Sequence, residues 1–205
     1  MTFADALARL EAGLRGALPG PAAQARLAPV PRRAWPPGVN PARPRDAAGL
    51  LLVFPKTGNN AHIILTVRSD SVRHGGQVSL PGGVVDPGET FEEAALREAH
   101  EEVALSLDQV RVLGALTPLD IPVSGFRLHP IVAVQPTRPQ LTPSDGEVAR
   151  ILEISVDELL SPRHFVTAQR ERDGFAFAVP AFQVAGVEIW GATAMVLSEF
   201  LALLT

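Results

Sequence analysis

Three glutamates that share one predicted helix face are the residues of this sequence best suited to chemistry. Glu101 and Glu102 follow Glu98 by three and four positions, so at about 3.6 residues per turn their carboxylates lie on one side. Like charges at this spacing repel, and Arg97, four positions before Glu101, can offset part of that repulsion. Clustered carboxylates also suit Mg²⁺ or Mn²⁺. The pattern therefore predicts a divalent-cation site, and the competing interpretation is an exposed acidic helix face.

The elements around these acids would hold them in place. A loop rich in glycine and proline spans residues 81–88, and Thr90 with Glu93 forms a capping box that starts the helix. An apolar stripe that can pack on a sheet lies next to the acids and consists of Leu96, Ala99 and Val103. The acids are therefore expected at the edge of a buried face, where carbonyl groups of the glycine loop can add metal ligands.

Together with that loop, the acids resemble the conserved box of the Nudix hydrolase family. The matching residues are Gly83, Glu89, Arg97, Glu98, Glu101 and Glu102, with Ala99 and Leu105 in the aliphatic positions. The departure is Ala104, because the family has a glycine there that ends the helix in a left-handed conformation, which costs alanine about 1 kcal/mol. The resemblance implies an α/β fold, the Nudix α/β/α sandwich around a mixed β-sheet.

The resemblance also implies a reaction, the hydrolysis of a nucleoside diphosphate linked to another moiety. The implied cofactor is Mg²⁺, with Mn²⁺ as a substitute, and the implied ligands are Glu98, Glu101, Glu102 and the carbonyl of Gly82. Arg97 would orient the acids, and Glu89 would brace the site. Similar enzymes take the general base from the box or from a later loop. Glu98 and Glu147, the latter between a loop and a predicted strand, are the competing candidates.

A second element, over residues 65–83, lies upstream of the box. It resembles the element that marks the coenzyme A pyrophosphatase branch of the family, and the fitting residues are Leu65, Thr66, Arg68, Ser69, Arg73, Gly76, Pro81, Gly82 and Gly83. Leu80 replaces a phenylalanine, and the spacing from Arg73 to Gly76 is one residue shorter than usual. The resemblance implies that the substrate is contacted by Arg68, Arg73, Gly76 and Gly83. Arginine forks suit a ligand that carries a 3′-phosphate beside its diphosphate.

The implied activity is Mg²⁺-dependent hydrolysis of coenzyme A or its derivatives to 3′,5′-ADP and 4′-phosphopantetheine or its acyl form. The nearest alternative is a Nudix hydrolase of another small molecule, such as ADP-ribose or NADH, and the 65–83 element discriminates between the two. A non-catalytic ligand sensor is the alternative from a different class. Such domains usually lose box glutamates, whereas this sequence keeps all four.

The rest of the sequence predicts alternating helices and strands. A helix from Phe3 carries Leu7, Leu10 and Leu14 on one face, with Thr2 and Asp5 at its start. An extended, proline- and arginine-rich arm without regular structure should follow over residues 19–45. Strands are expected over 49–54, 62–68, 110–116, 128–134 and 148–154, a hairpin over 175–179 and 183–189, and helices over 90–103, 156–160 and 192–204. This order favours a mixed sheet with helices on both faces.

Length and composition limit the number of domains and the kinds of partner and chemistry to expect. The 205 residues are 46% hydrophobic, which predicts one domain, with the helix and arm of 1–45 joined to a Nudix hydrolase domain over 46–205. The net charge of −4 argues against a nucleic-acid partner, although residues 1–45 carry seven arginines against two acids. The lack of cysteine excludes disulfides and a thiol nucleophile. Without a signal-type or membrane-spanning run, we expect a cytoplasmic bacterial enzyme, monomeric or homodimeric, that binds no membrane.

Overall fold

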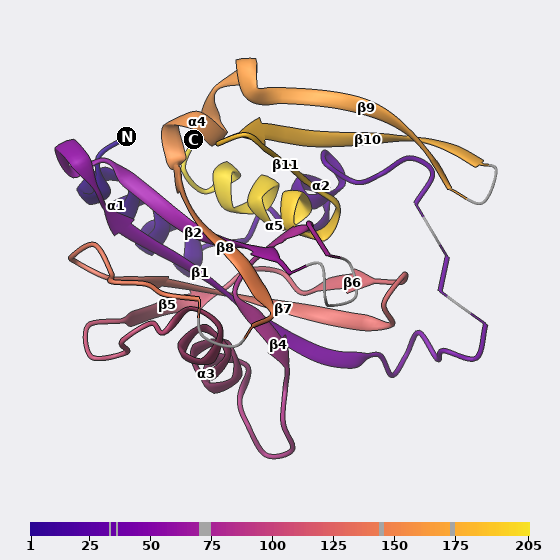
Figure 1. Cartoon of the computed structure of the whole chain (residues 1–205), viewed down its shortest axis with the longest axis horizontal. Coiled ribbons are helices and arrows are strands. Elements are labelled where there is room, and N and C mark those ends of the chain that lie inside the picture. Colours follow the sequence, from indigo (N-terminus) through magenta and orange to yellow (C-terminus); the bar gives the residue numbers. More distant parts are fainter. Residues whose placement is uncertain (33, 36, 70–74, 144–145, 173–174) are drawn as a thin grey trace.

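The computed structural model shows two sheets and a set of helices packed against them (Figure 1). It describes residues 1–32, 34–35, 37–69, 75–143, 146–172 and 175–205. The helices are α1 (Phe3–Arg15), α2 (Gly20–Ala25), α3 (Phe91–Val103), α4 (Val156–Leu160) and α5 (Gly191–Ala202). The strands are β1 (Arg45–Pro55), β2 (Ala61–Arg68), β3 (Val78–Ser79), β4 (Gly82–Val84), β5 (Arg111–Ala115), β6 (Leu119–Ile121), β7 (Phe126–Val134), β8 (Val148–Ser155), β9 (Phe165–Arg172), β10 (Phe175–Val184) and β11 (Val187–Trp190).

Strand β1 lies at the centre of the larger sheet. It runs parallel to β7 and antiparallel to β2 and β4, so the sheet is mixed, as predicted. Strand β8 pairs with β2 on the outer side, from His62 opposite Ser155 to Arg68 opposite Val148. The pairing of β4 with β1 sets Gly82 opposite Gly49 and Gly83 opposite Ala48. The glycine loop that precedes α3 is thereby fixed to the centre of the sheet.

Helices cover both faces of this sheet. The central strand β1 is therefore buried on both sides, which its continuous apolar run allows. Leu50 and Leu52 pack with Ala95 and Ala99 of α3 on one face. Leu51, on the other face, belongs to a larger cluster that is completed by α1 and α5. Figure 1 shows α3 on one side of the sheet, α1 and α5 on the other, and β9–β11 stacked beyond α5. The α/β/α sandwich implied by the sequence is therefore confirmed.

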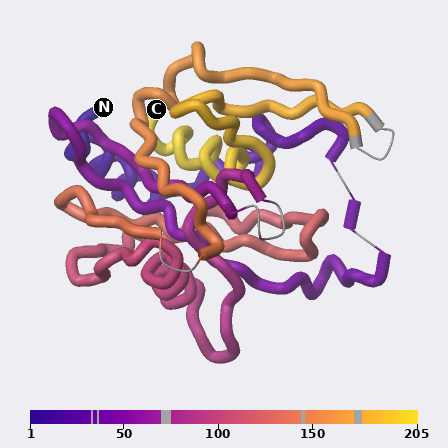
Figure 2. The backbone as a smooth tube through the Cα atoms, in the orientation of Figure 1, coloured from indigo at the N-terminus to yellow at the C-terminus, as the bar shows by residue number. Residues whose placement is uncertain are grey.

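The segment before β1 is anchored to the core by a buried glutamate. Glu199 of α5 is fully buried and accepts hydrogen bonds from the Gly20 N–H at 3.1 Å and from Gln24 Nε2 at 2.8 Å. It also accepts from the N–H and the hydroxyl of Thr117, at 3.2 and 2.7 Å. Farther along, Val30 and Ala178 of β10 exchange two backbone hydrogen bonds. Figure 2 shows the arm running down one side of the molecule from α2 to β1.

Several local predictions are confirmed, and others are wrong. Thr2 accepts from the Asp5 N–H and caps α1 as expected. The arm does contain regular structure, since α2 begins at Gly20 and carries Pro21 in its first turn, where the fixed φ of proline suits a helix start. Strand β9 was not expected, and β10 continues to Val184 instead of ending at residue 179. The turn to β11 lies at Ala185 and Gly186, which both have positive φ.

Among the described residues, no helix is both long and apolar enough to cross a membrane.

Candidate active site

The glutamates Glu98, Glu101 and Glu102, here called the acid cluster, are positioned by both ends of α3. At its start Thr90 accepts from the Glu93 N–H, and the Glu93 carboxylate accepts from the Thr90 N–H, which is the predicted capping box. At its end Ala104 is left-handed, with φ 53° and ψ 34°, and its N–H donates to the Ala99 carbonyl. Alanine thus adopts the conformation that the family's glycine would take.

Arg97 connects the acid cluster to the loop in front of α3. Its guanidinium donates to both carboxylate oxygens of Glu89, at 2.9 and 3.1 Å, and to the Val84 carbonyl at 3.1 Å. It also donates to Glu98 at 2.9 Å and to Glu101 at 3.2 Å. These hydrogen bonds lower the pKa of Glu89 and raise the pKa of Arg97. The roles of the Val84 carbonyl and of the Asp86 N–H, which donates to Glu89 at 3.0 Å, were not foreseen, because backbone atoms leave no sequence signal.

Glu102 lies deepest in the acid cluster. Only 5% of the Glu102 surface is exposed. Its carboxylate accepts a hydrogen bond of 3.1 Å from the Gly82 N–H. A side chain at position 82 is excluded, since a Cβ there would lie 2.3 Å from the Ala48 carbonyl oxygen. Gly82 is therefore joined to the acid cluster through its N–H, and its carbonyl stays a predicted metal ligand.

Glu98 occupies an electrostatically unfavourable position. Burial raises the pKa of its carboxyl above the ordinary glutamate value, and the charges of Glu101 and Glu147 raise it further, against the opposing effect of Arg97. Gly83 makes room for this side chain, because a Cβ on residue 83 would stand 2.4 Å from Glu98 Oε1. The substrate contact predicted for Gly83 is untested, whereas its packing against Glu98 is direct.

The two predicted residues from outside the box lie together beside the acid cluster. Arg68, at the end of β2, forms an ion pair of 3.3 Å with Glu147, which precedes β8. Glu147 lies near enough to Glu98 for its negative charge to add to the effect of burial in raising the pKa of Glu98. The Gly76 N–H donates to the Arg68 carbonyl at 2.9 Å and returns the chain to the end of β2. Arg73, the other predicted substrate contact, lies outside the described residues.

The donor set of the acid cluster fits a divalent cation, although the described residues do not form a preorganised site. No three acidic or histidine side chains among them have the arrangement of a metal centre. Arg97 engages Glu98 and Glu101, while the Gly82 N–H engages Glu102. The fit lies in the chemistry, since the carboxylates are hard oxygen donors and their mutual repulsion favours a positive charge between them. Glu98, Glu101 and Glu102 are the residues that would hold the ion.

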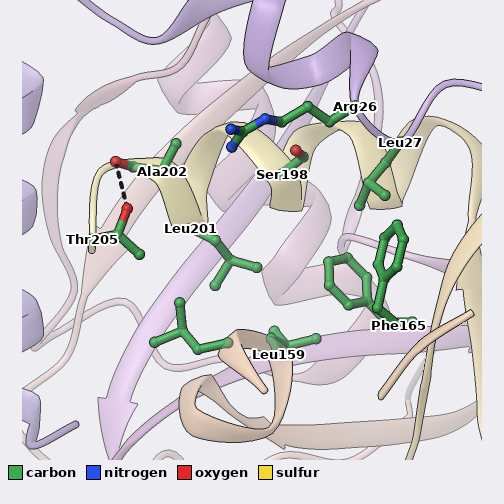
Figure 3. Close-up of a pocket in the computed structure, with 10 residues that line it drawn as sticks. Arg26, Leu27, Leu159, Phe165, Ser198, Leu201, Ala202 and Thr205 are labelled. Atoms are coloured by element: carbon green, nitrogen blue, oxygen red, sulfur yellow. Dashed lines mark hydrogen bonds between the residues drawn. The ribbon is translucent and has the colours of Figure 1, made fainter. Parts of the chain in front are cut away.

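A separate pocket lies against the far helix layer, next to α5 (Figure 3). It has a volume of about 330 Å³ and is lined mainly by apolar side chains, with Arg26 and Ser198 at its edge. The residues described around it include no aspartate or glutamate. This pocket therefore lacks the groups needed for metal or acid–base chemistry, and the acid cluster remains the candidate site.

A mixed sheet sandwiched by helices, with a glycine loop leading into a glutamate-rich helix, is the arrangement expected of a hydrolase with the box described above. Comparisons with known proteins agree. The model of the NUDIX domain matches residues 43–172. The chain is 35% identical over 167 residues to the uncharacterized Nudix hydrolase NudL of Pectobacterium atrosepticum, covering 80% of this chain and 85% of that protein. It is 40% identical over 137 residues to NudL of Yersinia enterocolitica, covering 66% and 70%.

A solved structure is similar as well. The crystal structure of RenU, a Nudix hydrolase from M. smegmatis, aligns with a TM-score of 0.50 and 29% identity, over 57% of this chain and 73% of that one. The chain therefore belongs to the Nudix hydrolase family. It is a pyrophosphatase that acts on anhydride bonds. Members of this family generally need a divalent metal ion and act on small nucleotide derivatives.

Proposed function

We propose that the protein hydrolyses the pyrophosphate bond of coenzyme A and its derivatives, giving 3′,5′-ADP and 4′-phosphopantetheine or its acyl form. The observation that carries this proposal is the 65–83 element, whose strand end and loop return are joined by the Gly76–Arg68 hydrogen bond and whose Arg68 pairs with Glu147. An element that marks one substrate branch is expected to lie at the substrate site. Arg68, Arg73, Gly76 and Gly83 are the proposed substrate contacts.

In the proposed reaction a water oxygen attacks one phosphorus atom of the diphosphate. A new phosphorus–oxygen bond forms and the bond to the bridging oxygen breaks. Each product keeps one of the two phosphates of the diphosphate. A bound Mg²⁺, or Mn²⁺ in its place, supplies charge neutralisation at the phosphates and activation of the water. We assign the holding of this ion to Glu98, Glu101 and Glu102, with the Gly82 carbonyl as a further ligand.

The chain's own residues have distinct parts in this proposal. Arg97 and Glu89 hold the carboxylates of Glu98 and Glu101 in place through the four hydrogen bonds between them. Two carboxylates compete to accept the proton of the attacking water. Glu98 is favoured because burial raises the pKa of its carboxyl, which makes the carboxylate a stronger base. Glu147 is favoured by its greater exposure, with 52% of its side chain accessible.

A substrate panel tests the proposal. With Mg²⁺ present, kcat/KM is measured for coenzyme A, 3′-dephospho-coenzyme A, ADP-ribose and NADH, and the products are separated by chromatography. We expect coenzyme A to be the best substrate and 3′,5′-ADP to be released. The 3′-dephospho form should be hydrolysed more slowly, since it lacks the phosphate that the arginines would bind. Equal or better turnover of ADP-ribose or NADH would overturn the substrate assignment and leave the pyrophosphatase activity in place.

A further inference from the structure

Arg68 lies where two neighbouring strands meet the active site. It is the last residue of β2 and pairs with Val148, the first residue of β8, and the register shifts between Val67 and Arg68. The extra residue, Ala149, lies on β8, and a bulge bends the strand that carries it. The Ser69 N–H donates to the carbonyl of Glu147. The backbones of Arg68 and Glu147 are therefore adjacent at this edge of the sheet.

The Arg68 side chain is the less exposed of the two, and the backbone that carries it is held by hydrogen bonds. The Arg68 N–H donates to the Gln77 carbonyl at 2.9 Å, and its carbonyl accepts from the Gly76 N–H at 2.9 Å. Its side chain is 27% exposed, against 52% for that of Glu147. A more buried arginine on a strand can restrain a more exposed carboxylate at the end of a loop, because the arginine loses less freedom when the pair forms.

This restraint acts against repulsion. Glu147 is close enough to Glu98 for the two negative charges to oppose each other. Arg97 compensates Glu89, Glu98 and Glu101 from its place on α3. Arg68 supplies a further positive charge from β2 and pairs with Glu147 at 3.3 Å. Removing the guanidinium would remove an attraction that opposes this repulsion.

We propose that Arg68 is a positioning residue that holds the carboxylate of Glu147 at the acid cluster. This inference rests on the proposed function, because it takes Glu147 to act during hydrolysis. It gives Arg68 a task beyond the substrate contact that its motif implies. The loss of the guanidinium should then lower turnover through Glu147, in addition to any loss of substrate affinity.

A double-mutant cycle separates these two tasks. Steady-state kinetics are measured with coenzyme A and Mg²⁺ for the wild type, Arg68→Gln, Glu147→Gln and the double variant. We expect Arg68→Gln to lower kcat about tenfold in the wild-type background and less than about twofold in the Glu147→Gln background. KM should rise by the same factor in both backgrounds, because the substrate contact of Arg68 is lost in each. Arg68→Lys, which keeps the charge, should recover part of the loss in kcat and also serves if Arg68→Gln does not fold.

Arg150→Gln is the matched control, since Arg150 is an exposed arginine of β8 that faces Val67 in the register. It should leave kcat and KM unchanged within about twofold. The inference is overturned if Arg68→Gln raises KM equally in both backgrounds with kcat unchanged, which marks a substrate contact alone. It is also overturned if the factors by which the two substitutions lower kcat multiply in the double variant, or if Glu147→Gln leaves kcat unchanged. Failure of the proposed substrate shows separately, as absent turnover of coenzyme A by the wild type. The cycle is then run with whichever of ADP-ribose and NADH the wild type hydrolyses.

Discussion

Gly83 faces the carboxylate of Glu98 so closely that a Cβ on residue 83 would stand 2.4 Å from Glu98 Oε1. Gly83→Ala should therefore displace Glu98 from the acid cluster and lower kcat/KM at least about tenfold, as misplacement of a reacting group by about 1 Å costs much of the rate. The measurement is steady-state turnover together with thermal unfolding.

The matched control for that substitution is Gly16→Ala, because a Cβ at position 16 would meet only ordinary contacts, the nearest at 3.6 Å. Gly16 lies at the end of α1, far along the chain from the acids. Full activity of Gly83→Ala would show that Glu98 does not need the position seen here.

Ala104→Gly should stabilise the protein. Ala104 has a φ of 53°, and the left-handed conformation costs alanine about 1 kcal/mol relative to glycine, partly offset by the greater freedom of glycine in the unfolded chain. We expect the free energy of unfolding to rise by about 0.5 kcal/mol, measured in denaturant. Ala185 has a φ of 49° in the turn between β10 and β11. Ala185→Gly should therefore raise the free energy of unfolding by a similar amount. A loss of stability in both variants would contradict this account of the two turns.

The ion pairs of Glu153 should give a defined pH dependence. Burial raises the pKa of this carboxyl, but hydrogen bonds and charge from Arg138 and Lys56 outweigh burial and leave the pKa below the ordinary value. Because the folded pKa is the lower one, the stabilisation is complete above the unfolded value of about 4.3 and is lost as the pH falls through the folded pKa.

Glu153→Gln should therefore lower the free energy of unfolding by about 0.5–1 kcal/mol at neutral pH. The difference from the wild type should shrink as the pH drops below about 4. Glu171→Gln, at an exposed position of β9, is the control and should behave like the wild type throughout. A difference for Glu153→Gln that is equal at neutral and acidic pH would rule out the ionic origin.

Local sequence patterns predicted the parts of the site that depend on near neighbours. The acid cluster and the capping box of Thr90 and Glu93 each follow from the spacing of a few residues and from helix geometry. The main strands were predicted as well, because their apolar runs are buried. These features need no knowledge of where the rest of the chain lies.

Contacts between distant segments could not be predicted in this way. The pairing of Arg68 with Glu147 depends on the register of β2 against β8, and the close approach of Gly83 to Glu98 depends on how β4 joins β1. Glu199 interrupts an apolar helix in the sequence, yet it proves to be a buried anchor for α2, since its donors come from remote segments. Ala185 carries no strong turn signal, which explains the misplaced hairpin.

The central claim is that the acid cluster of α3 hydrolyses coenzyme A with the help of a divalent cation. Its most direct test is the rate of 3′,5′-ADP release from coenzyme A with Mg²⁺, compared between the wild type and a folded Glu102→Gln variant. Glu102 is the buried member of the cluster, and the substitution keeps its size while removing its charge. The account predicts release by the wild type and a rate at least about 100-fold lower for the variant. Equal rates, or no 3′,5′-ADP from the wild type, would contradict it.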